Sequence, residues 1–379
     1  MLSVYAQENL DFMGKTGITS PEIHDNNTVT FRLKAPHATN VKVQGSWIPG
    51  QGYVQGTVDM IKATDGVWSY TTQVLPSELY SYSFIVDGLK MNDPNNVYSI
   101  RDVASVVNIF LIGGGQAELY KVNDVPHGTV ARQWYSSPTL NMTRKMTIYT
   151  PPGYEQGKKS YPVLYLLHGV GGDEEAWMSL GRTSQILDNL IAQGKAEPMI
   201  VVMPNGHTSN TAAPGESSKG FYKPIMMTPD VSNGDMEKSF NDVISFVEDN
   251  YRVKKGKADR AVAGLSMGGF HSLYISANYT NTFDYIGLFS PAIMPPNNAA
   301  STIYQKLDEK LKIQKENAYK LYWIAIGKED FLYKNVSDHR QKLDQMNFKY
   351  TYIESSGGHS WVNWRIYLSQ FVPLLFKNN

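Results

Sequence analysis

The first third of the chain alternates hydrophobic and polar residues over short stretches. These stretches are residues 28–33, 41–43, 66–70 and 80–86. Alternation places the apolar side chains on one face of a strand, and turns such as Asp65-Gly66 and Asp87-Gly88 separate the runs. The pattern predicts a small all-β, immunoglobulin-like sandwich over residues 1–112, with residues 103–112 as its last strand.

From Thr129 onward, continuous apolar runs alternate with longer segments of helical character. The apolar runs are residues 162–167, 199–203, 260–263, 286–289, 321–326 and 350–354. The segments long enough for helices are residues 174–193, 236–250, 268–278 and 301–314. This alternation predicts an α/β domain over residues 129–379, with a mostly parallel sheet covered on both faces. The three glycines that begin at Gly113 open an expected linker over residues 113–128.

Composition narrows the class of protein. The 379 residues suffice for two domains, and 35 basic residues balance 35 acidic ones, which gives no electrostatic argument for nucleic acid binding. No apolar run reaches the roughly 18 residues that a membrane span needs. The absence of cysteine excludes disulfides, thiolate catalysis and cysteine metal sites.

The N-terminus bears on localisation. Val4-Tyr5-Ala6 followed by Gln7 is similar to the end of a signal peptide whose upstream part is missing. We therefore expect an extracytoplasmic protein, periplasmic or secreted, with a truncated signal peptide. A chance alanine in a short tail is the alternative interpretation.

The sequence Gly264-Leu265-Ser266-Met267-Gly268 lies between a predicted strand and a predicted helix. Small residues around the serine allow a sharp turn, and strand, turn and helix are what a nucleophile elbow requires. The first N–H groups of the helix would face a developing negative charge. Taken alone, the motif is equally compatible with a Gly-rich turn of no catalytic role.

Two further motifs follow predicted strands and supply Asp330, in Gly-Lys-Glu-Asp-Phe, and His359, in Gly-Gly-His-Ser-Trp. The chain order of serine, aspartate and histidine is that of α/β-hydrolases. A neutral imidazole takes the serine proton during attack and later returns it to the leaving group. An acidic residue holds the ring in the required tautomer. Glu329 and Asp338 are competitors for this acidic role.

The sequence Leu-Leu-His-Gly-Val-Gly-Gly ends the first predicted strand of the α/β domain. Its glycines Gly169 and Gly171 would let the backbone approach a substrate oxygen. We assign the two oxyanion-hole donors to the backbone amides of Val170 and Met267. His168 is interpreted as structural rather than catalytic.

The substrate pocket is less clearly indicated. Trp177 and Trp361 are expected near it, where an aromatic wall would suit a phenolic acyl group, although packing in the core is the alternative. The polar residues 207–235 form a connection long enough to predict a substrate loop or lid. No paired histidines have metal-ligand spacing, so neither a metal nor another cofactor is expected.

Together these motifs resemble carbohydrate esterase family 1, the feruloyl and acetyl xylan esterases of the esterase D-like branch of α/β-hydrolases. The resemblance covers about residues 120–379, and its matching stretches are residues 149–154, 161–169, 264–269, 327–331 and 357–361. It implies serine ester hydrolysis without a cofactor, with Ser266, Asp330 and His359 as the triad.

The N-terminal region resembles a carbohydrate-binding module of family 48, or early-set domain. The matching stretches are residues 45–47, 66–68, 82–88 and 93–94. Trp47 and Trp68 would stack on sugar rings if this domain binds glycan, and both are equally compatible with a place in the core. A docking role that shapes the esterase cleft is the alternative function of this domain.

The expected activity is that of a serine carboxylesterase. It would remove feruloyl (hydroxycinnamoyl) groups from plant cell-wall arabinoxylan through an acyl-enzyme, with feruloylated or acetylated xylan oligosaccharides as its partners. An acetyl xylan esterase with a smaller acyl pocket is the main alternative. An enterochelin-type siderophore esterase and a non-catalytic glycan-binding protein are further alternatives, and the oligomeric state stays open.

Overall fold

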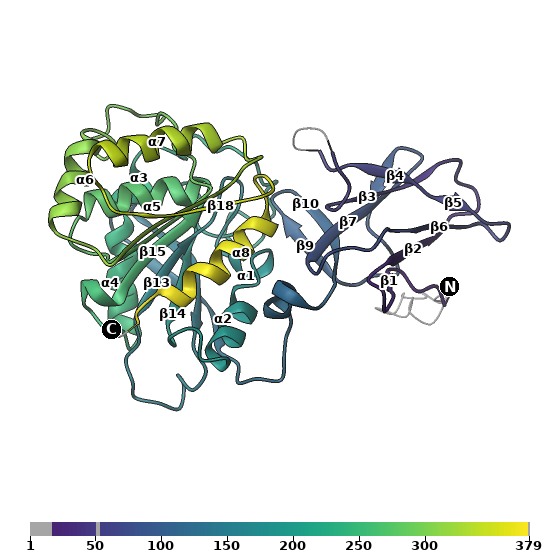
Figure 1. Cartoon of the computed structure of the whole chain (residues 1–379), viewed down its shortest axis with the longest axis horizontal. Helices are drawn as coiled ribbons and strands as arrows, with labels where there is room; N and C mark the ends of the chain where they lie inside the picture. Colours follow the sequence, from purple (N-terminus) through teal and green to yellow (C-terminus); the bar gives the residue numbers. More distant parts are fainter. Residues whose placement is uncertain (1–16, 51–53, 378–379) are drawn as a thin grey trace, which may run out of the picture. The chain divides into compact units, whose positions relative to one another are not determined.

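The computed structural model describes residues 17–50 and 54–377 (Figure 1). The predicted signal-peptide remnant therefore lies outside the described residues. The chain divides into two compact units. One comprises residues up to Arg101 with Ser105–Glu118, and the other comprises Asp102–Ala104 with the residues from Leu119 onward.

The first unit consists of two antiparallel sheets. The sheet of order β1-β2-β6-β5 contains β1 (Glu22–Ile23), β2 (Val29–Lys34), β5 (Ile61–Lys62) and β6 (Val67–Thr71). The sheet of order β4-β3-β7-β10-β9, with β8 paired to β7, contains β3 (Val41–Gly45), β4 (Thr57–Asp59), β7 (Leu79–Val86), β8 (Leu89–Met91), β9 (Ser99–Asp102) and β10 (Ser105–Leu111). The prediction of an all-β sandwich is confirmed, because the alternating residues bury one face of each sheet, for example Phe31 and Phe84.

Both tryptophans of this unit pack in its core. Trp68 is 7% exposed and its indole N–H donates to the carbonyl of Ala35 at 2.9 Å. Trp47 is half-buried and stacks on Phe31, with ring centroids 5.2 Å apart and planes 6° from parallel. Its ring also meets the edge of Phe110. The expectation that these rings stack on sugars is therefore corrected, because Trp68 is buried and Trp47 already stacks on Phe31 of the core.

The second unit contains an eight-stranded sheet of order β11-β12-β14-β13-β15-β16-β17-β18. Its strands are β11 (Thr129–Ser137), β12 (Met142–Thr150), β13 (Val163–Leu167), β14 (Ile200–Pro204), β15 (Arg260–Leu265), β16 (Tyr285–Phe289), β17 (Leu321–Gly327) and β18 (Thr351–Ser355). The six predicted apolar runs are the six parallel strands, which confirms the predicted α/β class. The antiparallel pair β11 and β12 was not predicted.

The helices of this unit are α1 (Ala176–Ser179), α2 (Thr183–Ala192), α3 (Asp235–Lys238), α4 (Phe240–Asn250), α5 (Met267–Asn278), α6 (Leu307–Glu316), α7 (Tyr333–Gln345) and α8 (Trp361–Phe371), with 3₁₀ turns at Lys257–Asp259 and Val372–Leu374. The predicted helix 174–193 is broken at Arg182, whose φ is 55°, and the predicted helix 236–250 is broken at Ser239. Likewise α6 begins only after Lys306, which is also left-handed. In the described part of the chain, no helix is long and apolar enough to cross a bilayer.

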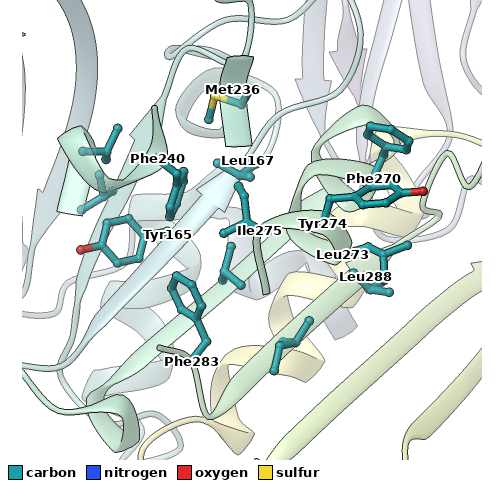
Figure 2. Close-up of a cluster of buried hydrophobic side chains, with 14 of the residues drawn as sticks. Tyr165, Leu167, Met236, Phe240, Phe270, Leu273, Tyr274, Ile275, Phe283 and Leu288 are labelled. Atoms are coloured by element: carbon teal, nitrogen blue, oxygen red, sulfur yellow. The ribbon is translucent and has the colours of Figure 1, made fainter. Parts of the chain in front are cut away.

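A large hydrophobic core holds helices α3–α7 against one face of this sheet. Figure 2 shows its centre, where Leu273 and Ile275 of α5 lie beside Leu167 of β13 and Leu288 of β16. Helix α8 packs on β16 and β17, and against α2. The sheet is therefore covered on both sides, and its strand ends are left for function.

The expected linker is ordered. It begins with a 3₁₀ turn at Gly115–Tyr120, and its second half is held by α2. The Asn189 amide donates to the carbonyls of Leu119 and Lys121, and the Gly128 N–H donates to Asp188. Residues from Leu119 onward therefore belong to the second unit rather than to a free connection.

Candidate active site

Ser266 stands at a strained turn between β15 and α5. Its φ of 52° and ψ of −114° are unusual for a residue with a side chain. A Cβ added at Gly264 would lie 2.5 Å from the backbone of Gly268, and one added at Gly268 would lie 2.3 Å from the carbonyl oxygen of Leu167. Only glycine fits at these two positions, because the elbow presses against the end of β13.

Backbone hydrogen bonds on both sides hold the serine in this conformation. The Ser266 N–H donates to the Phe289 carbonyl, and the Ser266 carbonyl accepts from the Ala292 N–H, each at 2.9 Å. Strain of this kind persists only where the surroundings impose it, and it concentrates at active sites. The geometry matches the nucleophile elbow that the motif predicts.

His359 and Asp330 meet at the ends of β18 and β17. The His359 Nδ1 lies 2.9 Å from Asp330 Oδ2, and the other oxygen of Asp330 accepts the Leu332 N–H at 2.9 Å. Because a carboxylate can only accept, Nδ1 carries the ring proton and Nε2 keeps its lone pair. Neither competitor takes this place, since Asp330 itself contacts the ring, and Asp338 pairs with Lys334.

Sheet register brings these motifs to one edge. Leu265, Phe289 and Ala325 are paired in line, and Ala325 is paired with Ile353 of β18. Ser266 follows the first of these residues directly, whereas Asp330 and His359 follow the last two within short loops. The carboxyl ends of parallel strands are where such folds place functional groups.

Aromatic rings surround the histidine. Its centroid lies 4.7 Å from that of Phe331 and 4.9 Å from that of Trp364, and Trp364 in turn meets Trp361 edge-on at 5.1 Å. Trp361 is partly exposed, which suits a pocket wall. Trp177 is only 1% exposed, and its N–H donates to the Leu167 carbonyl. The expectation of a direct substrate contact is therefore corrected for Trp177, which supports Trp361 from behind at 5.3 Å.

The expected oxyanion loop runs beside the elbow. A Cβ at Gly169 would lie 3.3 Å from the Ser266 Cβ, so the loop backbone passes close to the serine. Met267 is the first residue of α5, where an N–H has no partner within its helix. Among the described residues, no hydrogen bond engages the N–H of Val170 or Met267.

Two buried histidines hold this loop on either side of Val170. The Gly206 N–H donates to His168 Nε2 at 2.7 Å, so Nδ1 carries the proton and donates to the Gly169 carbonyl at 2.7 Å. The Gly171 N–H donates to His207 Nε2 at 3.2 Å. Burial lowers the pKa of His168 to about 3 and that of His207 to about 4, so both rings are neutral acceptors.

Residues that sequence reasoning missed support these histidines. His207 Nδ1 lies 2.8 Å from the Thr228 hydroxyl, and the His207 N–H donates to the Asn205 side chain, whose amide donates to Glu174. Burial raises the pKa of Glu174 to about 7. The position of Asn205 directly after β14 was the one available signal, whereas Thr228 lies in a loop with no pattern.

A cavity of about 220 Å³ adjoins the oxyanion loop. Gly171, Gly172 and His207 line one side, and the irregular segment that includes Tyr222, Ile225 and Thr228 lines the other. This segment belongs to the long connection predicted at residues 207–235, which contains no helix or strand before α3. In residues 17–50 and 54–377 no group of three or more His, Asp or Glu side chains is arranged to hold a metal ion.

The second unit thus has the architecture of an α/β-hydrolase, with a nucleophile elbow and an Asp–His pair at one edge of its sheet. A family described as "Putative esterase" matches residues 137–375, and the chain belongs to this esterase family.

Comparisons with individual proteins agree with the assignment to an esterase family. An endo-1,4-beta-xylanase/feruloyl esterase of Xylanibacter ruminicola is 28% identical over 96% of this chain and 47% of its own length. The chain therefore spans about half the length of this relative. A solved ferulic acid esterase is 25% identical, with a TM-score of 0.54 over 65% of this chain and 97% of its own. The enterobactin esterase of Shigella flexneri shares the fold, with a TM-score of 0.64, 18% identity and coverage of 91% and 92%.

Proposed function

We propose that this protein is a serine carboxylesterase that hydrolyses feruloyl esters on arabinoxylan through an acyl-enzyme. The observation that carries the proposal is the strained elbow of Ser266 at the same sheet edge as the hydrogen-bonded pair Asp330 and His359. Serine needs a neighbouring base to act as a nucleophile, and the free Nε2 of His359 is that base.

Acylation follows from this arrangement. The Ser266 hydroxyl attacks the ester carbonyl carbon while its proton passes to His359 Nε2. The oxyanion binds between the N–H groups of Val170 and Met267, and Asp330 stabilises the imidazolium. The bond to the sugar oxygen then breaks, and that oxygen takes the proton from Nε2. Water repeats the sequence on the acyl-enzyme, which releases the carboxylic acid and restores Ser266.

The acyl group is inferred from the surroundings and from the relatives. Trp361 and Phe331 place aromatic surface beside His359, which suits a phenolic ring. The relatives named above include a feruloyl esterase and a ferulic acid esterase. Since acetyl xylan esterases differ in the size of the acyl pocket, an acetyl ester remains the main alternative substrate.

We infer that feruloylated xylan oligosaccharides are the natural substrates and that the protein works outside the cytoplasm, where the polysaccharide is. We further propose that the two units are a carbohydrate-binding-module-like sandwich and a hydrolase domain.

The decisive experiment substitutes the nucleophile. Ser266→Ala should lower kcat for methyl ferulate by about 10⁴-fold or more and leave the circular dichroism spectrum unchanged. Ser276→Ala is the matched control, because the hydroxyl of this buried serine donates to the Leu273 carbonyl within α5 itself. Equal activity of wild type and Ser266→Ala would refute the mechanism. Feruloylated xylan, acetylated xylan and a cyclic catecholate triester, compared side by side on the wild type, identify the acyl group.

A further inference from the structure

Trp134 is the exposed exception among the tryptophans of this chain. Five of the seven tryptophans are buried or pack against a hydrophobic core. A sixth, Trp361, is partly covered. The Trp134 side chain is 46% exposed on β11, the edge strand of the large sheet. An exposed aromatic ring on an edge strand favours unwanted association with other protein chains. Its presence therefore indicates a functional role.

The register of the sheet places Trp134 level with the catalytic edge. Met146 is paired with Pro204, and Leu167 with Gly264. Tyr165 is paired with Val202, so Leu167 and Pro204, two residues further along, are level as well. Met146, Pro204, Leu167 and Gly264 therefore form one line across the sheet.

Trp134 lies one residue beyond this line. It is paired with Lys145, which precedes Met146, and so it is level with Leu265, the residue before the nucleophile. Four strand-to-strand steps separate β11 from β15, a lateral distance of about 19 Å at the usual spacing. This distance is within the reach of a short oligosaccharide.

The side chains beside the Trp134 ring are charged, and ion pairs hold them in place. The Lys145 ammonium lies 5.9 Å from the ring centroid, and it is held by Glu216 from the long loop that borders the cavity. Arg132, two residues along β11, makes two hydrogen bonds to Glu175. One aromatic face within a border of hydrogen-bonding groups matches a sugar ring, which has an apolar C–H face and a rim of hydroxyls. A protein interface would instead require a wider apolar centre.

We propose that Trp134 is a distal carbohydrate-binding subsite, which stacks on a sugar ring of the chain whose ester group lies at Ser266. The proposal rests on the proposed function in one respect, namely that the substrate is a carbohydrate ester. It also assigns the sugar-stacking role to the hydrolase unit, whereas Trp47 and Trp68 serve the core of the sandwich.

The test compares a substrate that reaches the subsite with one that does not. Trp134→Ala should lower the ratio of kcat/KM for a feruloylated arabinoxylo-oligosaccharide to kcat/KM for methyl ferulate by about three- to tenfold. Trp134→Tyr keeps an aromatic face and should retain most of the ratio. Ile313→Ala, an exposed apolar residue of α6, is the control and should not change it. An unchanged ratio in Trp134→Ala would overturn the proposal.

A binding measurement separates this proposal from the proposed function. Calorimetric titration of the full wild-type chain with an unesterified arabinoxylo-oligosaccharide should show binding that Trp134→Ala weakens by the same factor. If Ser266→Ala retained activity, the proposed function would fail while this titration still decided the role of Trp134. A change of oligomeric state in Trp134→Ala, with an unaltered titration, would assign the ring to a protein contact and refute the subsite.

Discussion

Contacts behind the reacting groups fix the positions of individual residues in this site. Val170 has no side-chain role in the proposed chemistry, yet its N–H is aimed by Gly169 and Gly171 on either side. Those two residues are held in turn by neutral, buried His168 and His207. An oxyanion donor displaced by about 1 Å costs roughly 100-fold in rate, so we propose that these histidines are positioning residues.

His207→Leu should lower kcat by about 10- to 100-fold with little change in KM, since the donor that it aims acts on the transition state. Binding of a boronic acid inhibitor, which mimics the oxyanion, should weaken by the same factor. His207→Gln should recover part of kcat, because its amide oxygen can accept the Gly171 N–H. His339→Leu replaces a buried histidine of α7 and serves as the control. A rise in KM at constant kcat would contradict the positioning role.

At the scale of elements, the elbow depends on how closely β15, α5 and β13 approach. The first turn of α5 is in contact with the Leu167 and His168 carbonyls at the end of β13, with no room for a side chain. The same closeness brings the oxyanion loop to the serine. The sheet and its helix therefore create the site together, and neither element would do so alone.

Gly268→Ala should reduce activity by about 100-fold and lower the free energy of unfolding by about 2 kcal/mol or more, since its Cβ must displace backbone atoms at 2.3 Å. The expected measurement is esterase activity together with urea denaturation. Gly256→Ala is the matched control, because its Cβ would meet the flexible Asp259 carboxylate at 3.2 Å and the Ala258 backbone nitrogen only at an ordinary contact distance of 3.9 Å. Similar behaviour of the two variants would show that the packing argument is wrong.

For the whole molecule, buried ionisable groups make stability depend on pH. Burial lowers the pKa of His168, His207 and His339 from the ordinary value of 6.5 to between about 3 and about 4. The unfolded chain therefore binds protons first as pH falls, so their contribution is complete above pH 6.5 and is lost toward pH 3. Glu174 acts in the opposite sense, because its pKa is raised to about 7 and its contribution is lost as pH rises through that value.

We accordingly expect the second unit to lose stability between pH 7 and pH 4. His339→Gln should reduce this loss by about 2 to 3 kcal/mol, since it removes one of the three histidines without touching the site. Urea denaturation at several pH values measures the slope. His37→Gln lies in the first unit, so it is the control and should not change the result for the second unit. A slope that is the same in wild type and His339→Gln would refute the assignment.

The parallel strands were predictable because they depend on local patterns, and the candidate catalytic residues were found in the same way. A glycine-flanked serine, a Gly-Gly-His sequence and continuous apolar runs are readable from neighbouring residues. Asp330 was put forward from the order of serine, aspartate and histidine, with Glu329 as a competitor, and its contact with His359 required the β17 and β18 loops to be folded. The breaks at Arg182 and Ser239 were not predicted, although Gly181 before the first break and the serine at the second are residues that favour helix ends.

The tertiary structure alone decided which side chains are buried and which residues distant in sequence meet. Tryptophan is compatible with a core, a pocket wall or an exposed platform, and only packing assigned Trp68 and Trp177 to the interior and left Trp134 exposed. The bracing of Val170 joins residues that follow β13, residues that follow β14 and Thr228 of a loop, which are distant in sequence. Such contacts have no local signature, because which surfaces meet depends on how the whole sheet and its helices pack.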